Sequence, residues 1–159
     1  CMPPLAASIA HFNSNGGGSV STLAGVGQCD EVADPANLAA VVAAARAADV
    51  VVLAVGGPCH EGEGTDRDYL ELPHGQGQLF GNLTAAGLGH KIAVVIINGG
   101  PFAIDDVKAS PAAVLQAGFP GQSGGRAIAE ILFGVVNPSG KLTTTVYPAV
   151  YAHGEPLGG

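Results

Sequence analysis

Three short apolar runs, each followed by glycines, organise the chain. They span Val50–Val55, Lys91–Ile97 and Ala112–Ala117. The first two are rich in β-branched residues and apolar at successive positions, which is typical of strands buried on both faces of a parallel sheet. The pattern predicts three neighbouring strands, each followed by a glycine-rich loop.

Helical patterns separate these strands. Ala36–Ala48 is dominated by alanine and has no helix breaker, and Asp34 followed by Pro35 is a helix-start signal. Further elements are predicted as helices over residues 75–86 and 126–133, a short helix or turn at 104–109, and a Thr-rich edge strand at Lys141–Val146. The alternation predicts an α/β fold: a three-layer α/β/α sandwich with a mostly parallel sheet and an edge strand near the C-terminus.

Composition narrows the classes of function. The chain has 159 residues, of which 47% are hydrophobic and 12% charged, with a net charge of −7. Clusters of Lys and Arg are absent, which argues against nucleic acid and against an anionic membrane surface. The longest apolar region, residues 38–55, is interrupted by Arg46 and Asp49, so no membrane-spanning helix is expected.

Charge is concentrated in one loop. Residues 60–68, directly after the first predicted strand, hold four of the thirteen acidic residues together with Arg67. Open α/β sheets bind their ligands at the carboxyl ends of the strands. Residues 60–68 are therefore the first place to look for chemistry, although a solvated acidic loop has the same composition.

Other chemistries fit the sequence less well. No glycine loop has the spacing of a dinucleotide-binding turn, and no Lys accompanies one. Ser123 lies in Gly-Gln-Ser-Gly-Gly, but only His153 follows it, so a turn and helix cap is the better interpretation. His60, with the carboxylates near it, lacks a second histidine for a metal site. We expect neither a metal nor a cofactor.

Acid/base catalysis by a carboxylate remains. Glu61 and Glu63 lie two residues apart, and like charges close together raise carboxyl pKa values, as a general acid near neutral pH requires. Asp66 and Arg67 are interpreted as an ion pair that supports the loop.

Several blocks, in order, resemble the C-terminal α/β sandwich domain of glycoside hydrolase family 3. The blocks are residues 48–56, Glu61–Arg67 with the spacing E-x-E-x-x-D-R, residues 70–73, 98–101, 118–125, 127–134 and 137–142. The E-x-E-x-x-D-R spacing and the Thr-Thr-x-Tyr-Pro ending are most similar to the β-xylosidase branch. The resemblance divides the chain into a flexible or incomplete N-terminal segment (1–24), the sandwich domain (25–148) and a tail (149–159).

The resemblance implies a retaining, exo-acting β-xylosidase or β-glucosidase that is secreted, extracellular or in the cell wall. In this family the sandwich domain supplies the general acid/base glutamate, a role that falls on Glu63, with Glu61 as second choice and Asp66 and Arg67 in support. The substrates would be β-linked xylosides or glucosides.

The family's nucleophile is an aspartate of a separate N-terminal barrel, which has no counterpart here, and the usual first strand of the sandwich is not recognisable in residues 1–24. The chain alone is therefore expected to be inactive and to need a barrel domain in cis or in trans. The alternative function is a non-catalytic sandwich module with a binding or structural role in a larger assembly.

Overall fold

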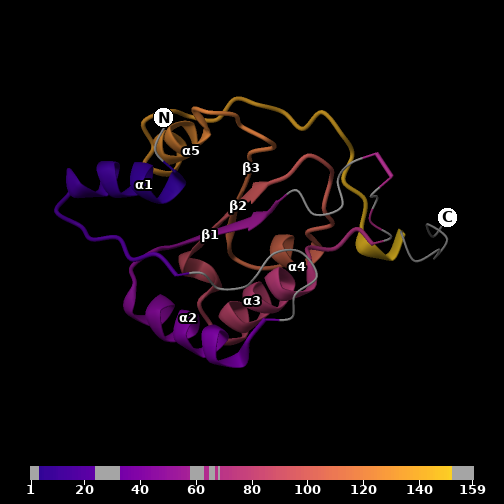
Figure 1. Ribbon diagram of the computed structural model, residues 1–159, viewed down its shortest axis with the longest axis horizontal. Coiled ribbons are helices and arrows are strands. Elements are labelled where there is room, and N and C mark those ends of the chain that lie inside the picture. The colour runs from indigo at the N-terminus through magenta and orange to yellow at the C-terminus, as the bar shows by residue number, and fades with distance from the viewer. Residues whose placement is uncertain (1–3, 24–32, 58–62, 65–66, 68, 152–159) are drawn as a thin grey trace.

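The protein is a layered α/β domain in which helices lie on both sides of a small sheet (Figure 1). The computed structural model describes residues 4–23, 33–57, 63–64, 67 and 69–151. Glu61, Asp66 and the three cysteines lie outside these residues. Within the described part of the chain, no helix is both long and apolar enough to cross a membrane.

The sheet consists of three parallel strands in the order β1-β2-β3. These are β1 (Val51–Gly56), β2 (Ile92–Ile97) and β3 (Ala113–Gln116). Val51 is paired with Ile92, and Ala93 with Ala113. The central strand β2 is buried on both faces, as its uninterrupted apolar run predicts. All three predicted strands are thus confirmed to within about two residues.

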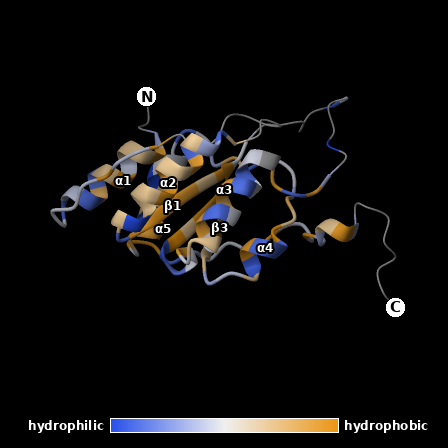
Figure 2. Cartoon of the chain, turned by 90° about the horizontal axis from the view of Figure 1, so that it is seen from below, coloured by the Kyte–Doolittle hydropathy of each residue, from blue (hydrophilic) through white to orange (hydrophobic). Residues whose placement is uncertain are grey.

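One face of the sheet carries the main hydrophobic core. It is covered by α2 (Pro35–Ala47), α3 (His74–Ala85) and the short α4 (Asp105–Lys108). The start of α2 is as predicted, because the Asp34 side chain accepts a hydrogen bond from the Ala36 N–H and Pro35 follows it. The core consists of Ala45, Leu53, Val55, Leu79, Phe80, Leu83, Leu88, Ile92, Val94, Ile96, Phe102 and Val107. Figure 2 shows the hydrophobic strands of the sheet lying between the helices.

The opposite face is covered by α5 (Gly124–Leu132) and α1 (Leu5–Ser14), which pack on each other. Ile128 and Ala129 of α5 are buried, and the Phe12 ring stacks on Phe133 with centroids 5.7 Å apart. The sequence pattern predicted α5 but not α1. Helices on both faces confirm the three-layer α/β sandwich.

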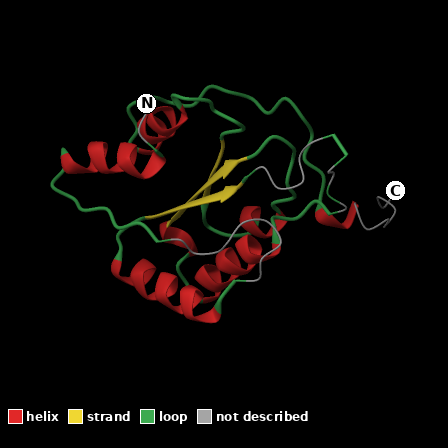
Figure 3. Ribbon diagram, in the orientation of Figure 1, coloured by secondary structure: helices red, strands yellow, loops and turns green. Residues whose placement is uncertain are grey.

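The predicted strand at Lys141–Val146 is not formed. This segment contains bends and irregular backbone, and residues 141–145 are exposed (Figure 3). A Thr-rich composition favours extended backbone, but a strand also needs a neighbour to complete its hydrogen bonds. Short 3₁₀ turns complete the described elements, η1 (Gly89–Lys91) and η2 (Ala149–Tyr151).

Candidate functional site

The loops that leave the carboxyl ends of the three strands form one edge of the sheet. We call this edge the rim and define it by the described residues 57, 63–64, 67 and 69–71 after β1, 98–103 after β2 and 117–123 after β3. Because the strands are parallel, all three loops leave from the same side. The rim therefore assembles the glycine-rich stretches that the sequence separates.

The exit from β1 is fixed by glycines and by Gln76. Gly56 has a φ of +107°, and a Cβ there would lie 2.2 Å from the carbonyl oxygen of Ile97, so only glycine fits. The buried side chain of Gln76 on α3 accepts a hydrogen bond from the Gly56 N–H (2.7 Å) and donates one to the Gly56 carbonyl (2.8 Å). The Gly57 N–H donates to the Ile97 carbonyl at 2.6 Å. The loop thus starts from a defined backbone position.

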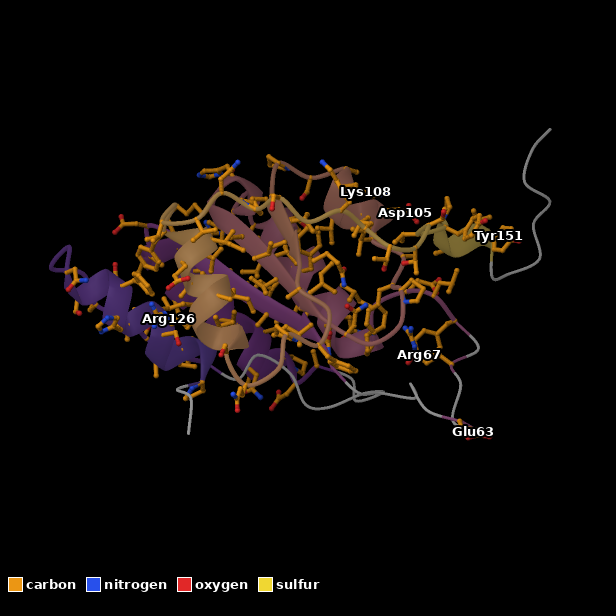
Figure 4. All side chains as sticks on the ribbon, turned by 90° about the horizontal axis from the view of Figure 1, so that it is seen from above. Glu63, Arg67, Asp105, Lys108, Arg126 and Tyr151 are labelled. Carbon is orange, nitrogen blue, oxygen red and sulfur yellow. The ribbon has the colours of Figure 1, made fainter. Side chains whose placement is uncertain are left out.

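Glu63, the first choice for a proton donor, lies on an exposed turn. It is followed by Gly64, whose φ of +77° suits the turn and whose surroundings are open. Figure 4 shows Glu63 at the outer edge of the molecule, farther from the sheet than Arg67. A carboxyl group in this position is accessible to a ligand that approaches the rim.

Arg67 joins this loop to the loop after β2. Its Nη2 donates a hydrogen bond to the Pro101 carbonyl at 3.0 Å. Its guanidinium carbon lies 3.9 Å from the ring centroid of the buried Phe102, and 5.9 Å from that of Tyr69. The first distance is well inside the range of a cation–π contact. Arg67 thus contacts Pro101 and Phe102, while the ion pair predicted with Asp66 lies outside the described residues and stays a prediction.

Backbone contacts join the same two loops. The Ala103 N–H donates to the Leu70 carbonyl at 2.6 Å, and Glu71 and Ala103 form an isolated parallel bridge. The loop after β1 therefore contacts the loop after β2 at two points, Arg67 and Leu70.

A pair of carboxamides at the rim was not identified as functional from the sequence. Gln116, the last residue of β3, donates from Nε2 to Oδ1 of Asn98, which follows β2 and is 3% exposed. Asn98 in turn donates from Nδ2 to the Gly100 carbonyl. The available signal was the position of Asn98, a polar residue at the end of a strand that is otherwise apolar.

The structure also bears on two other candidate roles considered from the sequence, a helix cap at Ser123 and a metal site. Ser123 occupies the N-cap position of α5, as predicted, but its side chain makes no capping hydrogen bond. Among the described residues, no group of three or more His, Cys, Asp and Glu side chains could hold a metal ion.

An open pocket of about 550 Å³ lies along α2 and α3, away from the rim. It is lined by residues such as Leu38, Arg46 and Asn82.

The fold is an α/β sandwich in which the described loops at the strand ends carry polar side chains such as Glu63, Arg67 and Asn98. A family model for the glycosyl hydrolase family 3 C-terminal domain matches residues 5–155, and the chain belongs to this family.

Individual relatives agree with this assignment. Beta-D-xylosidase 1 of Arabidopsis thaliana is 43% identical over 121 residues, which cover 74% of this chain and 16% of that protein. The crystal structure of a family 3 β-glucosidase from Bifidobacterium adolescentis superposes with a TM-score of 0.75 at 34% identity, covering 87% of this chain and 20% of that one.

A family 3 exo-β-xylosidase, solved in complex with a xylobiose aziridine activity-based probe, has a TM-score of 0.71 at 29% identity, with coverages of 98% and 20%. The chain thus spans a fifth or less of the length of these relatives.

Proposed function

We propose that this domain supplies the general acid/base of a retaining, exo-acting β-xylosidase or β-glucosidase, and that Glu63 is the residue. The observation that carries the proposal is the position of Glu63 on an exposed turn of the rim. It lies four residues before Arg67, which contacts Pro101 and Phe102 in the loop after β2. Family membership and the similarity to xylosidases and glucosidases support it. The nucleophilic carboxylate would come from a barrel domain, in the same polypeptide or in another.

The chemistry assigns Glu63 one proton transfer in each of two steps. In the first, the nucleophile forms a bond to the anomeric carbon while the bond from that carbon to the leaving oxygen breaks. The Glu63 carboxyl gives its proton to that oxygen. In the second step the Glu63 carboxylate takes a proton from water, whose oxygen replaces the nucleophile at the anomeric carbon.

The test is a Glu63→Ala variant of a protein that contains both this domain and the barrel. For xylobiose, whose leaving group needs a proton, kcat/KM should fall by roughly 10²–10⁴-fold. For 2,4-dinitrophenyl β-xyloside it should fall much less, because dinitrophenolate leaves without protonation. Azide should restore turnover of the activated substrate and give a glycosyl azide, since azide needs no general base.

Two further variants make the test specific. Asp49→Ala alters an exposed carboxylate at the amino end of β1, away from the rim, and should leave both substrates unaffected. Glu61→Ala tests the second choice, and the leaving-group pattern appearing there instead would move the role to Glu61. If neither glutamate variant shows the pattern, the alternative of a non-catalytic module with a binding or structural role gains support.

Location belongs to the same proposal. An enzyme that acts on β-linked xylosides or glucosides outside the cell would be secreted, extracellular or held in the cell wall. Immunodetection in the culture medium or the wall fraction of the source cells tests this, and confinement to the cell interior would contradict it.

A further inference from the structure

We infer that Asn98 and Gln116 are positioning residues for the acid/base loop, acting through Gly100, Pro101 and Arg67. The inference rests on the proposed function, because it assigns a catalytic consequence to contacts that lie outside the loop. It concerns two carboxamides at the ends of β2 and β3 that the glycosidase chemistry itself does not require.

The first link is the carboxamide pair. Asn98 uses both ends of its amide: Oδ1 accepts from Gln116 and Nδ2 donates to the Gly100 carbonyl. Since Oδ1 and Nδ2 have different partners, the orientation of the amide is fixed. Asn98 is almost fully buried, so loss of either partner would leave a polar atom without water to replace it.

The second link runs from Gly100 to Arg67. Gly100 immediately precedes Pro101, whose ring restricts its backbone φ. The position of the Gly100 carbonyl therefore limits where the Pro101 carbonyl can point, and that carbonyl accepts the Arg67 hydrogen bond. The next residue, Phe102, supplies the ring beneath the Arg67 guanidinium.

The third link is the short tether from Arg67 to Glu63. Four residues of chain span at most about 14 Å when fully extended, so anchoring Arg67 restricts the volume that Glu63 can reach. At the other end, Gly57 is fixed by its hydrogen bond to Ile97. The loop is thus anchored at its start on Ile97 of β2 and at Arg67 on Pro101 and Phe102, in the loop that follows β2. A general acid displaced by about 1 Å loses much of its effect.

A purely structural role would leave a different kinetic signature. A pair that only stabilised the sheet edge would change the melting temperature, and would affect all substrates alike in whatever folded enzyme remained. A pair that positions the general acid affects substrates in proportion to their need for a proton. Leaving-group dependence therefore separates the two roles.

The experiment compares Gln116→Leu and Asn98→Asp in the same barrel-containing protein. Gln116→Leu removes the donor to Asn98, and Asn98→Asp replaces the donor to Gly100 with an acceptor at nearly constant size. Each should lower kcat/KM for xylobiose about tenfold, a fraction of the roughly 10²–10⁴-fold effect of general acid catalysis, and change it less than about twofold for 2,4-dinitrophenyl β-xyloside.

Matched controls lie on α3. Asn82→Asp makes the same change at an exposed asparagine, and Gln78→Glu keeps the oxygen that accepts the Ala33 N–H. Both should leave the two substrates unaffected. If Asn98→Asp does not yield folded protein, Gln116→Leu carries the test, because Gln116 is exposed and its replacement is tolerated more easily.

The decisive step repeats Gln116→Leu in a Glu63→Ala background. If the pair acts through Glu63, the tenfold effect on xylobiose should disappear there. An effect that persists, or an equal loss on both substrates, would overturn the inference. Failure of the proposed function would give a different result. Glu63→Ala alone would then change kcat/KM for xylobiose and for 2,4-dinitrophenyl β-xyloside by the same factor, whatever the effect of Gln116→Leu.

Discussion

The guanidinium of Arg67 lies over the ring of Phe102, with 3.9 Å between the guanidinium carbon and the ring centroid. These residues are 35 positions apart in the sequence and belong to loops that follow different strands. A contact between a cation and a buried aromatic face combines packing with electrostatic attraction, and is stronger when water is excluded from the ring.

This contact should be measurable as a coupling energy. In a double-mutant cycle of Arg67→Gln and Phe102→Leu, we expect a coupling of about 0.5–2 kcal/mol in the free energy of unfolding. Urea denaturation of the 159-residue chain measures it. Phe119→Leu, at an exposed rim position, is the control and should change stability by less than about 0.5 kcal/mol. Strict additivity of Arg67→Gln and Phe102→Leu would mean that the two side chains do not interact in solution.

Gly56→Ala should be severely destabilising. The new Cβ would lie 2.2 Å from the Ile97 carbonyl oxygen at a φ of +107°, so both a clash and backbone strain arise. We expect a loss of at least about 2 kcal/mol in the free energy of unfolding. Gly134→Ala also has a positive φ (+71°) but open surroundings, and should cost about 1–2 kcal/mol. Equal losses at the two positions would show that Ile97 does not restrict residue 56.

The hydrogen bonds between Gln76 and Gly56 predict a second stability effect. Gln76→Leu leaves a buried N–H and a buried carbonyl without partners, and should cost about 2–4 kcal/mol in the free energy of unfolding. Gln78→Leu, on the exposed side of α3, removes a single hydrogen bond to Ala33 and should cost about 1 kcal/mol or less. Similar losses from both replacements would count against the role given to Gln76.

Gln76→Glu adds a pH dependence with a definite sign. The introduced carboxyl group can donate to the Gly56 carbonyl only when protonated, so folding should raise its pKa above the unfolded value of about 4.3. Its stabilising contribution is then fully present below about pH 4.3 and is lost as the pH rises through the folded-state pKa. Urea midpoints measured from pH 4 to pH 8 should fall relative to the unsubstituted chain. A constant difference across this range would contradict the prediction.

The cap of α2 offers a smaller effect. Asp34→Ala removes the acceptor for the Ala36 N–H and should cost about 1 kcal/mol, while Asp34→Asn or Asp34→Ser should recover most of it. Thermal denaturation by circular dichroism can measure the series. An alanine variant as stable as the original chain would show that the hydrogen bond to Ala36 does not contribute.

The elements predicted correctly are those whose local pattern agrees with their final surroundings. β2 is apolar at every position and is buried on both faces, and α2 has a cap, a proline and an alanine-rich body. Helix α1 was missed because its start has no side-chain cap and no acidic residue, and its packing against α5 involves residues more than a hundred positions away. The strand expected at Lys141–Val146 failed for the opposite reason: its composition favoured a strand, but no neighbour pairs with it in the described chain.

In the candidate site too, features that depend on neighbouring residues were predictable and contacts between distant residues were not. Clustered charge after a buried strand was enough to indicate residues 60–68 as the candidate site, because these charges lie in one short stretch, while the resemblance to glycoside hydrolase family 3 placed the proton-donor role on Glu63. The partners of Arg67 were beyond prediction, since Asp66 is its neighbour in sequence whereas Pro101 and Phe102 approach it only once β1 and β2 pair. Asn98 and Gln116 look like ordinary strand-end residues until the sheet places them together.

The register of the sheet has a consequence for the order of folding. Val51 pairs with Ile92, 41 positions away, whereas Ala93 pairs with Ala113, only 20 positions away. Closing the longer loop costs about 0.6 kcal/mol more in chain entropy. We therefore expect β2 and β3 to associate first and β1 to join them afterwards, which pulsed hydrogen exchange during refolding would test through earlier protection of β3 than of β1. On this pathway Glu63, which lies within the longer connection, takes its place only after β1 has joined β2.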